Sequence, residues 1–249
     1  MPITTYLLLA AAAFMAGAVN AVAGGGSFFT FPALVFAGMP SIVANASSSV
    51  ALLPSSFASA WAYRDLRQDF EGISFKALLA VSIAGGTTGA LLLLFTPQST
   101  FDIIIPWLLL MATLIFAFGP YMGPRFRALF RIRPATFLPV KFLIGVYAGY
   151  FGGAVGLIML ATYSLFGLKD FKVMNASKTL LGGTMNAAAV VLFIIAGKVA
   201  WPQTSVMVFG AALGGYVGAH AGRRLNTRPV RIIVTIVSVI MTIVFFSRT

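Results

Sequence analysis

"AVAGGGSFF" (residues 21–29) places three consecutive glycines inside a strongly apolar chain, and "GYFGGAVG" (149–156) repeats the interruption 128 positions later. Glycine clusters interrupt helices and let backbone amides face a ligand. Around them, 59% of the 249 residues are hydrophobic and only 9% are charged, and the mean hydropathy is +0.97. Soluble proteins carry about 25% charged residues. The sequence therefore predicts an all-α polytopic membrane protein with helices broken at the glycines.

Hydropathy divides the chain into ten apolar segments, arranged as two sets of five. The first set covers about 4–22, 27–38, 42–63, 73–95 and 100–118, and the second covers about 137–151, 154–167, 173–196, 204–221 and 230–247. In both sets the second segment is short, whereas a membrane-crossing helix needs about 20 residues. We therefore expect a glycine-broken, re-entrant pair plus three spans in each set. The total is eight full spans plus two short segments, or ten crossings.

The two sets match in detail, which indicates an internal duplication. The matching positions are Gly17, Gly24 and Gly25 with Gly145, Gly152 and Gly153; Asn45–Ser47 with Asn175–Ser177; and Gly85, Gly86 and Gly89 with Gly214, Gly215 and Gly218. We expect a first transmembrane repeat over 1–122, a basic cytoplasmic linker over 123–136 and a second repeat over 137–249.

The basic residues predict the orientation. Fourteen of the 17 lysines and arginines fall in or beside four connections between the apolar segments, namely 64–72, 119–136, 168–172 and 222–231. We count Lys141 with the connection at 119–136. The positive-inside rule places these in the cytoplasm and both termini outside. The counterpart of the first connection, around Lys198, then lies outside, so the repeats are predicted to be inverted. The net charge of +12 reflects this orientation in the inner cell membrane and not binding to nucleic acid.

The glycine clusters form the first candidate site. A helix that begins after such a cluster presents free amides and a favourable dipole to an anion. Plain close packing of membrane helices is the alternative, because small residues let backbones approach each other. The candidate substrate-binding residues at the glycine clusters are Gly24, Gly25, Gly26, Ser27, Gly152 and Gly153.

The second candidate site is the repeated triplet in "NASSSVALLP" (45–54) and "NASKTLLGGT" (175–184). The pattern fits a glycosylation sequon, but one copy would be cytoplasmic. A helix cap is the stronger alternative, yet one cap needs one side chain. The surplus polar groups need a partner helix, a cavity or a ligand. The candidates are Asn45, Ser47, Ser48, Asn175, Ser177 and Lys178.

Lys178 is the most informative single residue. A lysine within a membrane helix is costly and usually marks function, although snorkelling to the interface is an alternative. Asp170 lies on the loop side, and Asp102 lies at the external end of its segment. No carboxylate within the membrane is therefore evident as a partner, and we expect Lys178 to supply charge in an anion pathway.

An intramembrane enzyme is the competing class. The chain has no cysteine, five acidic residues and one histidine, His220, placed near the end of its segment. Hydrolysis would need a Ser-His or Asp pair or a metal cluster. We expect neither an enzyme nor a cofactor or metal site.

Four stretches together resemble the TauE/SafE family of sulfite-exporter-like permeases. They are "AVAGGGSFFTFPAL", "ANASSSVALLPSSFASAWAYR", "MNASKTLLGGTMNAAAVVLFIIAGKVAWP" and "GGYVGAHAGRRL". The resemblance runs from about residue 15 to the C-terminus, with Ser48 and Ala154 as departures. It implies a secondary transporter that exports sulfite, sulfoacetate, thiosulfate or related organosulfonates by alternating access, with the glycine turns and both polar helices as its site. Three alternative functions stay open: a channel-like anion facilitator, an uptake permease for another small anion and a non-transporting membrane scaffold. The protein could also form a homodimer.

Overall fold

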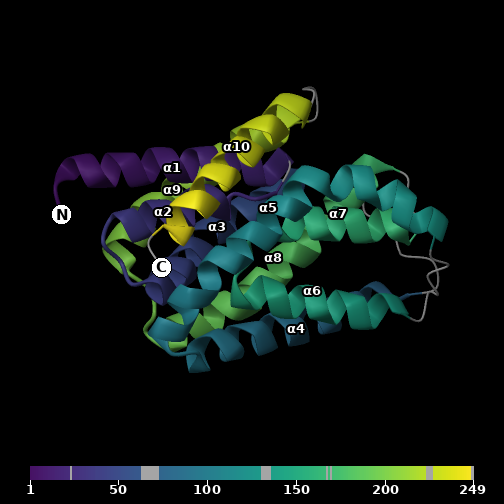
Figure 1. The fold of residues 1–249 in the computed structure, drawn as a ribbon, viewed down its shortest axis with the longest axis horizontal. Helices are drawn as coiled ribbons and strands as arrows, with labels where there is room; N and C mark the ends of the chain where they lie inside the picture. The colour runs from purple at the N-terminus through teal and green to yellow at the C-terminus, as the bar shows by residue number, and fades with distance from the viewer. Residues whose placement is uncertain are drawn as a thin grey trace.

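The computed structural model describes residues 1–22, 24–62, 73–129, 136–166, 168, 170–222 and 227–247, which form ten α-helices (Figure 1). Their bounds are α1 Ile3–Val22, α2 Ser27–Phe36, α3 Ser41–Ala62, α4 Phe75–Phe95, α5 Gln98–Leu129, α6 Phe137–Tyr150, α7 Val155–Leu165, α8 Phe171–Ile195, α9 Trp201–Gly222 and α10 Thr227–Phe246. The all-helical expectation is confirmed for this part of the chain. The helix ends fall within about three residues of the predicted segments, with one exception.

The exception is the end of α5. We predicted that the fifth segment stops near residue 118, but the helix continues to Leu129. Hydropathy falls where Arg125 and Arg127 appear, yet arginine is a good helix former, so leaving the apolar zone does not end a helix. The range assigned to a linker is therefore helical as far as Leu129, and residues 130–135 lie outside the described residues.

Within the described part of the chain, four helices are long and apolar enough to cross a membrane. They are Ile3–Val22, Phe75–Phe95, Gln98–Ile115 and Lys172–Ile195. Several others are apolar but shorter, including the 10-residue α2 and the 11-residue α7 that follow the glycine clusters. This composition makes the chain a multi-pass membrane protein.

Both glycine clusters break the bundle near the middle of its long axis (Figure 1). The α1–α2 pair enters from the end that carries the N-terminus, and the α6–α7 pair enters from the opposite end. At the first break Gly24 has φ +79°, and a Cβ added there would lie 3.0 Å from Gly156 Cα. The two breaks therefore touch, and only glycine combines that backbone angle with that contact.

Glycines outside the breaks bring helices together. A Cβ added at Gly85 of α4 would lie 2.9 Å from Gly145 Cα in α6. A Cβ added at Gly17 of α1 would lie 2.8 Å from Gly215 N in α9. Backbones this close need small residues. Close approach of the backbones therefore accounts for glycine at these positions.

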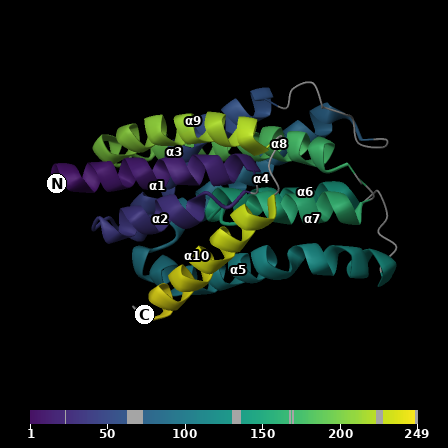
Figure 2. The same ribbon diagram turned by 90° about the horizontal axis from the view of Figure 1, so that it is seen from above.

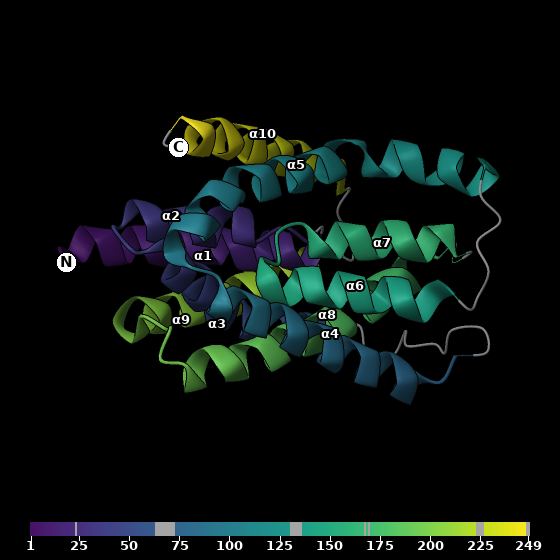
Figure 3. The same cartoon turned by 60° about the horizontal axis from the view of Figure 1, so that its bottom comes forward.

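The remaining helices complete the bundle around α3 and α8, which pack against each other and against α9 and α4 respectively. α10 crosses α5 obliquely on one side of the molecule (Figures 2 and 3). Where they meet, Thr113 and Thr242 share a hydrogen bond of 3.0 Å.

The two ends of the bundle differ in what they carry. α5 and α7 end, and α4, α6 and α8 begin, toward one end of the bundle, whereas α1 begins and α10 ends toward the other (Figures 1 and 3). The orientation of these ends in the membrane stays a prediction. Some of the basic residues used for this prediction, and one near the C-terminus, lie outside the described residues. They are Arg64, Arg67, Arg131, Arg133, Lys169, Arg223, Arg224 and Arg248.

Candidate functional site

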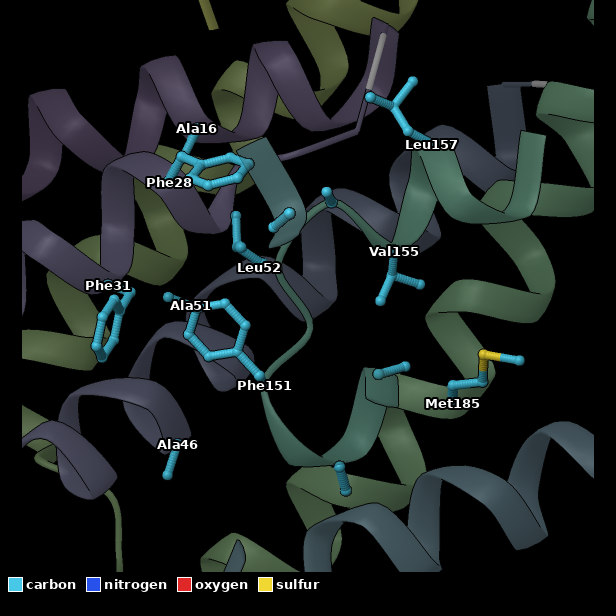
Figure 4. Packing of buried hydrophobic residues seen from close by; sticks show 14 of the residues in the cluster. Ala16, Phe28, Phe31, Ala46, Ala51, Leu52, Phe151, Val155, Leu157 and Met185 are labelled. Atoms are coloured by element: carbon cyan, nitrogen blue, oxygen red, sulfur yellow. The ribbon is translucent and has the colours of Figure 1, made fainter. Parts of the chain in front are cut away.

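A cavity lies between α3 and α8 and is bounded by both glycine breaks. Its volume is about 90 Å³, measured as the space open to the centre of a water-sized sphere. One water needs about 10–15 Å³ on this measure, so the cavity can hold several waters or a small oxyanion. Leu52, Phe151 and Val155, labelled in Figure 4, form an apolar part of the wall. The rest of the wall combines nine polar side chains with five glycines, Ala148 and Met159.

Lys178 carries the charge in this cavity. Its side chain is 4% exposed, and its Nζ has no hydrogen-bond partner among the described residues. The acidic residues that the structure describes are occupied elsewhere. Asp170 caps α8 by accepting from the amides of Lys172 and Val173, and Asp102 accepts from Ser41 Oγ and from Gln98 Nε2 at 2.9 Å. A buried, unpartnered cation beside a cavity is suited to bind an anion.

Two helices begin at the cavity wall. Ser27 is the first residue of α2, Val155 is the first residue of α7, and both line the cavity. A helix N-terminus favours negative charge. At the first break the amides of Phe28 and Phe29 donate to the carbonyls of Gly25 and Gly26. Gly24 N donates to the carbonyls of Val19 and Asn20, so the amides before Phe28 that a ligand could use there are those of Gly25, Gly26 and Ser27.

The structure brings five of the twelve predicted site residues to the cavity. They are Gly25, Ser27, Ser48, Gly152 and Lys178. Ser48 is buried and shares a hydrogen bond of 2.6 Å with Thr30 Oγ1, so α2 and α3 are joined at the wall.

Other predicted residues make contacts between helices instead. Asn45 Nδ2 donates to the carbonyl of Tyr150 at 3.0 Å, and Ser47 Oγ accepts from the amide of Ala200 at 3.0 Å. Asn175 and Ser177 are buried in α8, and Asn175 Oδ1 has no hydrogen-bond partner among the described residues. The capping alternative is wrong for both asparagines, because each lies four residues inside its helix.

The remaining glycines lie beside the cavity rather than in its wall. Gly24 packs on Gly156, and a Cβ added at Gly26 would lie 2.5 Å from the carbonyl oxygen of Ala16. A Cβ added at Gly153 would meet the ring of Phe151 at 2.5 Å. These positions shape the breaks.

Sequence reasoning missed several polar residues of the wall. They are Asn20, Ser49, Ser56, Ser59, Thr179 and Asn186. Asn20 Nδ2 donates to Ser56 Oγ at 3.4 Å, and Asn186 Nδ2 donates to the carbonyl of Ser49 at 2.8 Å. The available signal was helical spacing, because Ser49, Leu52, Ser56 and Ser59 follow one another at intervals of three or four positions and share one helix face.

The wall uses corresponding positions of the two halves of the chain. Four pairs lie 130 positions apart on α3 and α8, and two lie 128 apart on the segments that lead through the breaks. The pairs are Ser48 with Lys178, Ser49 with Thr179, Leu52 with Gly182, Ser56 with Asn186, Asn20 with Ala148 and Ser27 with Val155. The cavity is therefore symmetric in position but not in chemistry, since only the second half supplies a cation.

One expectation about a basic residue is wrong. Lys141 was counted among the residues between the repeats, but it lies four residues inside α6 and is fully buried. Hydropathy averages over a window and cannot separate a lysine at a helix surface from one turned inward. Lys141 Nζ donates to Tyr163 Oη at 3.0 Å and lies 5.2 Å from the centroid of that ring.

The described residues contain no group of three or more His, Cys, Asp or Glu that could hold a metal ion. His220 is exposed near the end of α9, with Nδ1 3.0 Å from the carbonyl of Tyr216, and it does not line the cavity.

Fold and site together define a multi-pass helical membrane protein with a polar cavity between broken helices, the arrangement in which transporters hold their substrates. The profile of the family described as "Sulfite exporter TauE/SafE" matches residues 9–245. The chain therefore belongs to the TauE/SafE family, and the resemblance seen in its motifs is confirmed.

Known relatives cover most of the chain. The "Probable membrane transporter protein YfcA" of Escherichia coli K12 is 32% identical over 234 residues, which is 92% of this chain and 85% of the relative. The "Probable membrane transporter protein" of Haemophilus influenzae is 32% identical over 92% of this chain and 89% of its own length. The "Probable membrane transporter protein ORF9" of a Sinorhizobium species is 31% identical over 93% and 88%. No solved structure gives a significant match.

Proposed function

We propose that the protein is a secondary transporter that exports small sulfur-containing oxyanions, such as sulfite, sulfoacetate, thiosulfate or related organosulfonates, by alternating access. The observation that carries the proposal is Lys178, a buried cation without a hydrogen-bond partner among the described residues, at a cavity lined by polar side chains. The family description and the relatives' names support transport of this kind.

The substrate would lie between α3 and α8. Lys178 would supply the charge, the amides before Phe28 and the N-terminus of α7 would donate hydrogen bonds, and Ser27 and Ser48 would complete the contacts. Asn175 lies one turn before Lys178 and Thr179, and its side chain would also contact the substrate when the cavity opens. Asn45 and Ser47 would hold the helices around the site.

The second part of the proposal is that residues 1–122 and 137–249 form inverted repeats. The helix packing supports it, because the contacts come in equivalent pairs: α1 on α9 with α6 on α4, α3 on α9 with α8 on α4, and α2 on α10 with α7 on α5. Thr113 and Thr242, which bond to each other, lie 129 positions apart. Such contacts are expected on the axis that relates two repeats.

Orientation and direction complete the proposal. With the basic connections in the cytoplasm and both termini outside, the inside-negative potential of the inner membrane drives anions outward. It contributes about 2.3 kcal/mol per charge per 100 mV. No dedicated coupling ion is needed, and rocking of one repeat against the other would alternate access.

The competing functions make different predictions. A non-transporting scaffold favours a closed interface between the repeats, whereas here the interface holds a polar cavity. A channel-like facilitator would show no counterflow of labelled anion. An uptake permease would accumulate the anion in right-side-out vesicles against the inside-negative membrane potential.

Transport of labelled sulfite into everted vesicles or proteoliposomes tests the proposal. We expect saturable, potential-driven transport with counterflow, and loss of about tenfold or more in kcat/KM for Lys178→Met, because the charged contact contributes more than 1.4 kcal/mol. Asn175→Ala should lose less. Lys198→Met, which changes an exposed lysine outside the cavity, is the control. Wild-type transport by both Lys178→Met and Asn175→Ala would disprove the site.

A further inference from the structure

A second buried lysine lies outside the cavity. Lys141 of α6 is fully buried, and its one hydrogen bond in the described residues goes to Tyr163 Oη of α7. An ammonium has three donors, so two have no acceptor within the part of the chain that the structure describes. The rings of Phe137, Tyr163 and Phe166 surround the pair, with centroids of Phe137 and Tyr163 6.2 Å apart.

The pair lies on helix faces that lead from the cavity. Lys141 precedes Ala148 of the cavity wall by seven residues, which is two turns or about 10 Å at 1.5 Å per residue. Tyr163 follows Met159 of the wall by four residues, or one turn. Ile144, 6% exposed, lies between Lys141 and Ala148 on the same face. The pair is therefore displaced from the cavity toward the end of the bundle where α6 begins and α7 ends.

The first half of the chain has no equivalent of this pair. The positions 128 residues earlier are Ala13, which is fully buried, and Val35. Among the described residues, Asn175 Oδ1, one turn from Lys178 toward the same end of the bundle, also lacks a hydrogen-bond partner, as do Ser82 Oγ and Tyr147 Oη. The buried lysine–tyrosine pair is therefore a feature of the second half alone.

A structural tie between α6 and α7 would not need a cation. A buried charge in a membrane helix is costly, and an apolar pair of the same size would join the helices without that cost. Charge at this position is useful where an anion passes.

We infer that Lys141 and Tyr163 form a second anion-binding station between the cavity and the end of the bundle where α6 begins, which is the cytoplasmic end if the proposed function is correct. The remaining donors of Lys141 bind the oxyanion on its way to Lys178, and Tyr163 holds the ammonium group in place. Ile144 and Met159 separate the two stations in the present conformation.

Thiol labelling tests the station without measuring transport. The chain has no cysteine, so Ile144→Cys introduces a single thiol between the two lysines. In everted vesicles we expect an anionic methanethiosulfonate reagent to label it several-fold faster than a cationic one. Lys141→Met should remove that preference. Ala16→Cys, at the equivalent position of the first half, is the matched control and should show none. An unreactive thiol at position 144, or a preference that survives Lys141→Met, would refute the station.

Sided transport separates this inference from the proposed function. Lys141→Met should raise the KM for sulfite about tenfold when sulfite is presented at the end where α6 begins, the effect of one lost charged contact. The KM from the opposite side should stay unchanged. Lys141→Arg should restore transport, and Tyr163→Phe should give a smaller effect. If Lys178→Met fails while Lys141→Met behaves like the wild type, only the station is wrong. If neither affects transport, the site of the proposed function is wrong as well.

Discussion

Two buried lysines differ in what surrounds them. Lys141 has a phenol partner and an aromatic ring beneath it, whereas Lys178 Nζ has no partner among the described residues. Neither faces a carboxylate that the structure describes. Because an unpaired buried charge opposes folding, its presence at Lys178 is a cost that ligand binding can offset.

A stability measurement tests this cost. We expect Lys178→Met to raise the free energy of unfolding by about 1–2 kcal/mol without ligand, because an apolar side chain of similar length replaces an unpaired ammonium. We also expect sulfite to stabilise the wild type and to have no such effect on Lys178→Met. Thermal unfolding in detergent, with and without sulfite, gives both values, and Lys198→Met should change neither. A destabilised Lys178→Met protein would show that the ammonium has a stabilising partner.

Helix packing depends on glycine at particular faces. In α4 and α6 the backbones meet at Gly85 and Gly145, and in α1 and α9 they meet at Gly17 and Gly215. A glycine inside a helix costs about 0.5–1 kcal/mol relative to alanine. The packing gained by close approach must exceed that loss where the helices touch.

Two alanine substitutions separate the packing effect of a glycine from its conformational cost within a helix. At Gly85 a Cβ would lie 2.6 Å from the carbonyl oxygen of Phe142, so we expect Gly85→Ala to destabilise by about 1–3 kcal/mol through overpacking. At Gly182 of α8 the nearest atom is Met159 Sδ at 3.5 Å, an ordinary contact. Gly182→Ala should therefore be neutral or stabilise by about 0.5–1 kcal/mol. Thermal unfolding compares them, and equal effects would contradict the packing argument.

At the scale of the whole molecule, α3 and α8 form the central contact between the proposed repeats. The cavity lies in their interface, and Asn186 of α8 donates to the Ser49 carbonyl of α3 across it. Motion of one repeat against the other would change this interface first.

A reversible cross-link tests that motion. A Cβ added at Gly183 would lie 3.4 Å from Ser56 Cβ, close to the separation of about 3.5–4.5 Å in a disulfide. We expect the Ser56→Cys/Gly183→Cys protein to form a disulfide on mild oxidation, seen as loss of maleimide labelling. Sulfite transport should stop and return after reduction, whereas each single variant should be insensitive to oxidant. Full transport by the cross-linked protein would rule out movement at this interface.

Helix boundaries and glycine breaks could be predicted from the sequence, because both depend on local properties. Apolar segments of helical length and clusters such as Gly24–Gly26 are visible along the chain, as is Lys178 within an apolar segment. The end of α5 was missed because hydropathy shows where a segment stops being apolar, and not where its helical backbone ends. The family could also be identified, because its motifs occur in order.

The cavity wall, in contrast, depended on which helix faces meet. Asn45 and Ser47 looked equivalent to Ser48, yet they bond to Tyr150 and Ala200 while Ser48 lines the cavity. Asn20, Ser56 and Asn186 come from three helices, and the sequence does not show that they converge. The sequence by itself determined the helices, their breaks and the position of Lys178 within the apolar part of α8. Only the tertiary structure decided which polar groups surround that charge and that Lys141 is buried, because these depend on packing between segments far apart in the chain.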